Sequence, residues 1–226
     1  MEGTVLEGDY ILVNSASFLG GELPGRGTPC VFRFPGRRDE VVPAEEQKYL
    51  CRCVAVAGDT LEMRDGMLYV NGEQEIPVPG VQRREHPGYN PERDQYRTFP
   101  RGMGFTSQNW GPMRIPKAGD HISLNVDSTV SAGELFRRWN VFIGREGHVL
   151  EQSETGLNVD GERVRSYTVE RDYVFYLGDN RNDSQDSRYF GFSAAEDIIG
   201  IPFLVYFSVS SEDGGVRWDR IAAGIE

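Results

Sequence analysis

Lysine is scarce in this sequence of 226 residues, in which Lys48 and Lys117 are the only two. Arginine therefore supplies nearly all of the 24 basic side chains, against 35 aspartates and glutamates. The resulting formal net charge of -11 argues against a nucleic-acid partner, because a phosphate backbone repels an acidic protein. We expect no nucleic-acid binding.

Cysteine is also scarce, and its positions argue against a metal. Cys30, Cys51 and Cys53 are odd in number and have neither the paired spacing nor the clustered histidines of a zinc site. Cys30 and Cys53 lie in strand-like runs and are expected to be buried as small apolar residues. We expect no metal and no cofactor.

Long apolar runs and common catalytic motifs are absent as well. No run approaches the roughly 18 to 20 residues of a membrane-spanning helix, and no targeting segment opens the chain, so the chain as given is expected to be soluble. There is no G-x-S-x-G elbow, H-E-x-x-H helix or G-x4-G-K-[ST] loop. The 38% of hydrophobic residues nevertheless indicates a folded domain.

Alternating apolar residues and turn signals predict a mainly β fold. Asp65-Gly66, Asn71-Gly72 and Asp160-Gly161 are hairpin turns by composition. Two capping-box patterns, Ser131-x-x-Glu134 and Ser193-x-x-Glu196, predict short helices. Strands are expected at residues 9–13, 30–34, 50–56 and 173–177.

A change in amino-acid composition divides the chain. Between residues 76 and 166 the sequence is rich in proline, glycine and arginine and has fewer long alternations. We interpret residues 76–166 as a smaller, mixed domain inserted into a β core formed by residues 1–75 and 167–226.

The densest group of polar residues is the segment 178–188, which follows an apolar strand. So many polar groups are costly to order unless they bind one another. Asp186 and Arg188 are two residues apart and are expected to form a bidentate ion pair. A surface loop that satisfies its own hydrogen bonds explains the segment equally well.

The pattern Gly178-Asp179-Asn180-x-x-x-Ser184-x-Asp186-Ser187-Arg188 resembles the last conserved box of the bacterial type I signal peptidases. These are membrane-anchored serine proteases that remove export signals. Four further stretches resemble the family in the same order, namely residues 1–13, 31–35, 52–62 and 111–120. The resemblance covers almost the whole chain and implies a signal peptidase-type β core with an inserted domain.

The two central residues of the family's chemistry are missing. The family cuts with a serine nucleophile and a neutral lysine as base. The resemblance places the serine immediately before Met1 and the lysine at Cys51, counting back from Gly58-Asp59 without a gap. A neutral thiol accepts a proton poorly, and Lys48 is expected to face away because strand side chains alternate.

The resemblance assigns roles to residues that remain. Ser184 corresponds to the serine that orients the lysine amine, so its oxygen is expected within about 6 Å of the Cys51 sulfur. Asp186 and Arg188 correspond to an ion pair beside it, and Asp179 and Asn180 to polar residues that define the turn. Substrates of the family bind as an added β-strand, with small side chains in shallow pockets. By position, the residues that line these pockets are Met1, Val5, Ile11, Val31, Tyr49 and Leu50.

The resemblance therefore implies signal peptides of exported preproteins and the membrane surface as partners. It implies a location on the outer side of the bacterial cytoplasmic membrane. Two explanations for the missing serine stay open: a chain that starts too late, with the anchor lost, or a natural relative that gave up catalysis. Cys51 favours the second or an engineered change, because truncation does not replace an internal lysine. A catalytically dead peptide- or partner-binding homologue is the alternative function, and a β-rich binding module outside the family is a more distant one.

Overall fold

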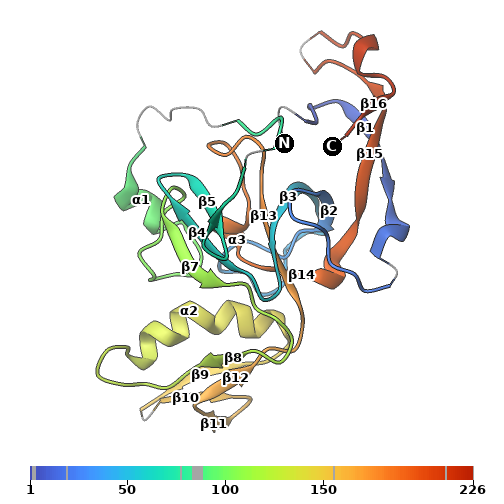
Figure 1. The fold of residues 1–226 in the computed structure, drawn as a ribbon. Coiled ribbons are helices and arrows are strands. Elements are labelled where there is room, and N and C mark those ends of the chain that lie inside the picture. Colours follow the sequence, from blue (N-terminus) through green and yellow to red (C-terminus); the bar gives the residue numbers. More distant parts are fainter. Residues whose placement is uncertain are drawn as a thin grey trace.

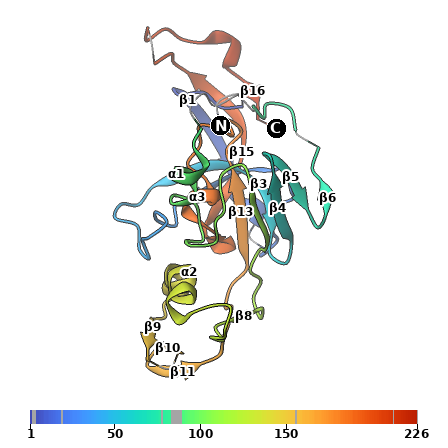
Figure 2. The same cartoon turned by 90° about the vertical axis from the view of Figure 1, so that its left-hand side faces the viewer.

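Strands make up most of the regular structure, which confirms the mainly β fold class. The structure, a computed structural model, describes residues 1, 4–18, 20–76, 78–82, 89–154, 156–211 and 213–225. Figures 1 and 2 show a larger β body and, below it, a lobe that contains helix α2 (Ala132–Arg145).

The central sheet of the described residues has seven strands in the order β1-β15-β2-β3-β13-β14, with β16 paired to β15. Neighbouring strands are antiparallel. Strands β2, β3 and β13 read as nearly continuous apolar runs because both of their faces are covered. The bounds are β1 (Asp9–Asn14), β2 (Pro29–Arg33), β3 (Lys48–Val56), β13 (Tyr173–Leu177), β14 (Ser193–Ala194), β15 (Ile198–Ser208) and β16 (Ala223–Gly224).

A second sheet has the order β6-β5-β4-β7 and contains β4 (Thr60–Arg64), β5 (Met67–Val70), β6 (Glu73–Gln74) and β7 (Trp110–Arg114). Both predicted hairpin turns in it are confirmed. Asp65-Gly66 connects β4 to β5 and Asn71-Gly72 connects β5 to β6, with positive φ at all four residues. A two-residue hairpin turn of this kind needs two successive positive φ values, and Asp-Gly and Asn-Gly adopt them at low cost.

The lobe packs α2 against β9 (Leu150–Ser153) and β10 (Gly156–Val159). Strand β11 (Glu162–Val164) completes their sheet, and β8 (His121–Ser123) pairs with β12 (Ser166–Thr168). Helix α2 begins at the predicted capping box. The Ser131 side chain accepts from the Glu134 backbone, and the Glu134 carboxylate accepts from the Ser131 backbone. The predicted turn at Asp160-Gly161 connects β10 to β11.

The second predicted helix is wrong. Ser193 lies in β14, where it pairs with Val174 of β13 and its side chain is fully buried. Only a 3-10 turn, η2 (Ala195–Asp197), follows before β15 begins at Ile198. Pairing with the central sheet therefore overrides the local capping pattern. The remaining short elements are η1 (Ser15–Phe18), α1 (Pro91–Gln95), α3 (Ser187–Phe190) and η3 (Trp218–Arg220).

The predicted inserted domain, residues 76–166, shares contacts with the predicted core. Strand β7 belongs to this range but pairs with β4. One buried apolar cluster contains Leu68 and Phe175 from the core together with Trp110 and Phe142 from the insertion. The division at residues 76 and 166 therefore stays a prediction. In the described ranges, no helix combines the length and the apolar character that crossing a bilayer requires.

Candidate functional site

Cys51 lies in the middle of the central sheet, directly opposite Cys30 of the neighbouring strand β2. Its side chain is 3% exposed. Burial raises the pKa of the Cys51 thiol far above its usual range, and the nearby carboxylates of Asp186 and Asp179 raise it further. Cys51 is therefore a protonated thiol near neutral pH. Cys30 and Cys53 are fully buried, as the sequence predicted, and burial raises the pKa of Cys30 to about 12.

Lys48 does not reach the position of Cys51. The register between β2 and β3 runs without a shift from the pair Pro29–Arg52 to the pair Arg33–Lys48, so no bulge changes the alternation of side chains. Lys48 lies three residues from Cys51, on the opposite face, and is exposed. No local feature of the strand brings this amine to the site.

Gly178 makes room for Ser184 beside Cys51. Leu177 pairs with Arg52, and continuing that register by one residue puts Gly178 opposite Cys51. A Cβ atom added to Gly178 would lie 2.1 Å from the Ser184 Oγ. Because paired residues project to the same face, the Ser184 hydroxyl occupies the space over Gly178 on the face of the thiol. This arrangement supports the predicted approach of Ser184 to Cys51, whose oxygen–sulfur distance stays a prediction.

The predicted ion pair of Asp186 and Arg188 is confirmed. Arg188 Nε and Nη2 donate to the two Asp186 oxygens, each at 2.8 Å, and both side chains are at most 1% exposed. Asp186 also accepts from the Gly178 and Arg188 backbone and caps α3. Arg188 donates further to the Ser107 and Arg181 carbonyls. The pair thus fixes both ends of the segment that carries Ser184.

A second buried ion pair, which the sequence did not reveal, lies on the other face of β3. Arg52 Nε and Nη2 donate to the Asp179 carboxylate at 2.9 and 2.8 Å. Asp179 is fully buried and also accepts from the Thr4 hydroxyl. The Arg52 guanidinium holds the pKa of Asp179 below its usual range even though burial opposes this shift. Asp179 therefore connects the N-terminal segment to β3, beyond the turn-defining role expected of it.

Asn180, the other predicted turn residue, is buried in a contact with a distant segment. Gln82 N–H donates to the Asp179 carbonyl at 2.7 Å, and Arg181 N–H donates to the Gln82 carbonyl at 3.0 Å. Gln82 and Asn180 thus form a parallel bridge. The end of the segment 78–82 is held against the loop that follows β13.

The predicted substrate-binding residues come from several elements, and their convergence on one pocket stays a prediction. Val31 and Leu50 are paired across β2 and β3, while Tyr49 pairs with Phe32 on the opposite face. Ile11 lies in β1, which β15 separates from β2. Met1 and Val5 belong to the N-terminal turn, where the Val5 N–H donates to the Met1 carbonyl.

The backbone nitrogen of Met1 is close enough to Cys51 and Asp179 to act on both pKa values. The Thr4 hydroxyl, which donates to the Asp179 carboxylate, holds the N-terminal turn against this part of the fold.

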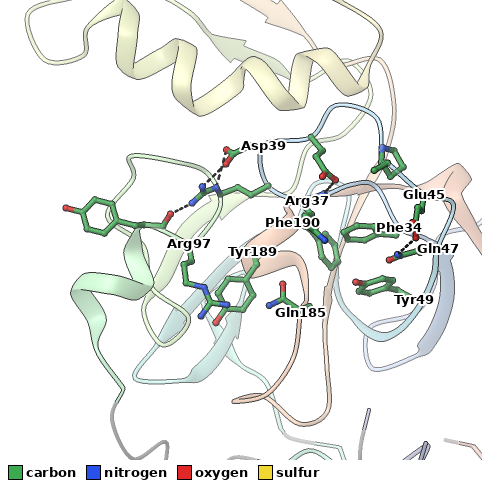
Figure 3. Close-up of a pocket in the computed structure, with 15 residues that line it drawn as sticks. Phe34, Arg37, Asp39, Glu45, Gln47, Tyr49, Arg97, Gln185, Tyr189 and Phe190 are labelled. Carbon is green, nitrogen blue, oxygen red and sulfur yellow. Dashed lines mark hydrogen bonds and ion pairs between the residues drawn. The ribbon is translucent and has the colours of Figure 1, made fainter. Parts of the chain in front are cut away.

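Tyr49 lies in a cavity of about 760 Å³ that Figure 3 shows in close-up. Its ring stacks on Phe34 with centroids 4.4 Å apart, and Phe190 meets both rings edge-on.

Within the part of the chain that the structure describes, no group of three or more His, Cys, Asp or Glu side chains is placed to hold a metal.

Comparisons with known proteins find relatives that match most of this chain. A sequence profile of the family described as "Signal peptidase, peptidase S26" matches residues 1–207. Signal peptidase I of Aquifex aeolicus (strain VF5) is 30% identical over 223 residues, which cover 92% of this chain and 72% of the relative. Signal peptidase I of Helicobacter pylori (strain J99) is 23% identical over 267 residues, which cover 100% of this chain and 82% of the relative. A crystal structure of a signal peptidase I from Enterococcus faecalis V583 is 21% identical, covers 80% of this chain and 97% of that chain, and has a TM-score of 0.34.

Proposed function

This chain belongs to the signal peptidase family, peptidase S26, and from that premise we propose that it binds signal peptides of exported preproteins but that its 226 residues do not cleave them. The observation that carries the proposal is Cys51, a buried, protonated thiol in the central sheet. A serine nucleophile needs a base for its proton, and a thiol with a raised pKa is a poor acceptor.

The surroundings of Cys51 support the assignment of this position to the family's lysine. Ser184 occupies the space beside it, and Asp186 and Arg188 fix the segment that carries Ser184. These surroundings suit a lysine at position 51. Burial would lower the pKa of its amine towards neutrality, and the Ser184 hydroxyl would orient it. The resemblance places the nucleophile before Met1, ahead of the N-terminal turn whose Thr4 hydroxyl donates to Asp179.

An exposed aromatic surface supports a place at the membrane. Tyr10 of β1 contacts Tyr206 and Phe207 of β15, and all three side chains are exposed. Phe203 is 48% exposed on the same strand, and Trp218 is 76% exposed. Aromatic side chains of this kind prefer the boundary between water and lipid. We propose that this surface rests on the outer, extracytoplasmic face of the bacterial cytoplasmic membrane.

Peptide cleavage by four proteins tests the proposal. The unmodified chain, Cys51→Lys, a chain with a serine added before Met1, and the combined variant are incubated with an Ala-x-Ala signal peptide. Only the combined variant is expected to cleave, because nucleophile and base act as a unit. The matched control adds the serine to Cys51→Met, which fills a similar space without an amine and is expected to be inactive.

Two results would contradict the proposal. Cleavage by the unmodified chain would show that it is an active peptidase. Rescue by the added serine alone would identify Cys51 or Lys48 as a working base. A silent but folded combined variant that still binds the peptide would favour the dead peptide-binding homologue, in which the groove itself has changed.

A further inference from the structure

Two neighbouring cavities form one groove that begins at Ser184. The cavity around Tyr49, of about 760 Å³, shares Arg97, Gln185 and Tyr189 with a second cavity of about 310 Å³, which Ser184 also lines. We call the two together the arginine groove. Figure 3 shows Gln185 and Tyr189 lying between Arg97 and the aromatic rings of Phe34 and Tyr49.

The groove contains three guanidinium groups without a carboxylate partner among the described residues. Arg37, Arg93 and Arg97 line it, and Arg97 lies over the Tyr189 ring at 5.3 Å. Arg38, in contrast, pairs with Asp39. In a protein with a net charge of -11, carboxylates are plentiful, so three unpaired arginines in one groove are available to a ligand.

Four of the five acidic residues that line the groove, all except Asp183, accept hydrogen bonds from neighbouring groups. Asp39 accepts from Arg38 and Arg101, and Glu40 accepts from the Arg37 backbone. Asp94 is buried and accepts from the Ser107 backbone. The carboxylates of Glu45 and Asp183 are exposed at its edges.

The wall of the groove is fixed before any ligand binds. Arg145, at the end of α2, donates to the carbonyls of Gly36, Arg37, Glu40 and Phe190. Its side chain is partly buried, and burial lowers its pKa to about 10. The loop that carries Arg37 is therefore tied to α2 and α3. Binding a ligand there costs little further conformational entropy, because the loop is already ordered.

The groove lies next to the site but apart from the predicted pockets for small side chains. Tyr49 precedes Cys51 by two residues on the same face of β3, a separation of about 7 Å along a strand. Val31 and Leu50 are on the opposite face. Because the groove begins at Ser184, on the same face of β3 as Cys51, a peptide held beside Ser184 would continue into the arginine groove on that face.

We propose that the arginine groove binds acidic side chains in the segment of the substrate that follows the cleavable bond. The proposal rests on the proposed function, since it takes the ligand to be the same peptide. Arg37, Arg93 and Arg97 supply the charge-assisted contacts, while the rings of Phe34 and Tyr49 supply apolar surface for the extended chain.

Peptide binding to the full chain tests this. Three fluorescent peptides share an Ala-x-Ala sequence and carry three glutamates after it, three glutamines after it, or three glutamates before it. Binding is measured by fluorescence anisotropy at low and at high salt. We expect the first peptide to bind about tenfold more tightly than the other two at low salt, with a smaller difference at high salt. The double variant Arg37→Gln/Arg97→Gln should lose this preference.

A control with the same change of charge is Arg64→Gln/Arg114→Gln, two exposed arginines of the second sheet, and it should keep the preference. Equal binding of the three peptides would overturn the groove proposal and leave the proposed function intact. Failure of every Ala-x-Ala peptide to bind would overturn both. Preference that persists in the Arg37→Gln/Arg97→Gln variant would show that acidic residues bind elsewhere, and would also overturn the groove.

Discussion

Removing the Asp186 carboxylate should be among the most damaging single changes in this protein. In Asp186→Ala, the guanidinium of Arg188 stays 1% exposed and keeps only the Ser107 and Arg181 carbonyls as partners. Breaking a buried pair in this way costs about 3–5 kcal/mol, because an uncompensated charge is left inside. Gly178 N–H also loses its acceptor, which adds about 1 kcal/mol or more.

Urea unfolding followed by circular dichroism measures this loss. Arg188→Met should also destabilise, but Asp186→Ala/Arg188→Met should cost less than the sum of the two, by about 1–3 kcal/mol, because no charge is left unpaired. The matched control is Asp39→Ala, whose side chain is 53% exposed and pairs at the surface, and it should cost less than about 1 kcal/mol. A loss below about 1 kcal/mol for Asp186→Ala, or simple additivity, would refute this reasoning.

Three further changes have defined outcomes. Gly178→Ala forces a Cβ atom to 2.1 Å from the Ser184 Oγ, so urea unfolding should show a loss of about 1–3 kcal/mol in the free energy of unfolding. Adding Ser184→Gly to the same chain should largely restore this loss, and no restoration would contradict the packing. Hydrogen bonds to the carboxylates of Asp160 and Glu170 raise the pKa of His148 above 6.5, so its stabilising effect is fully present below pH 6.5 and is lost as pH rises through the raised value. The stability difference between the unmodified chain and His148→Gln should therefore shrink over that range, and a constant difference would refute the linkage. Ser131→Ala should cost about 1 kcal/mol in thermal unfolding, and no shift in Tm would mean that the capping box contributes nothing.

Features that depend on neighbouring residues were predictable from the sequence. The turns at Asp65-Gly66, Asn71-Gly72 and Asp160-Gly161 formed as expected, because positive φ is a local property of those residues. The ion pair of Asp186 and Arg188 was predictable for the same reason, since the two residues are only two positions apart.

Features that depend on pairing between residues far apart in the chain were not predictable from the sequence. Ser193 carries the same capping pattern as Ser131, yet pairing with β13 makes it part of a strand. Arg52 and Asp179 are 127 residues apart, so no local pattern connects them. The arginine groove likewise combines the loop after β2, β3, α1 and the loop before α3, and only the folded chain shows that Arg37 and Arg97 line the same cavity.

The alternation of side chains along β3 fixes the number of residues that this strand can contain. Cys51 faces Cys30, while its neighbour Arg52 reaches Asp179 on the other face. Deleting one residue between 53 and 56 would exchange the faces of every side chain before the deletion and leave both the thiol and the guanidinium on the wrong side. A deletion in the connection 41–46 would leave the alternation within β3 unchanged, because the pairing of β2 with β3 sets the register afterwards. Evolution can therefore vary the length of that connection, whereas within β3 it can change residue types but not their number.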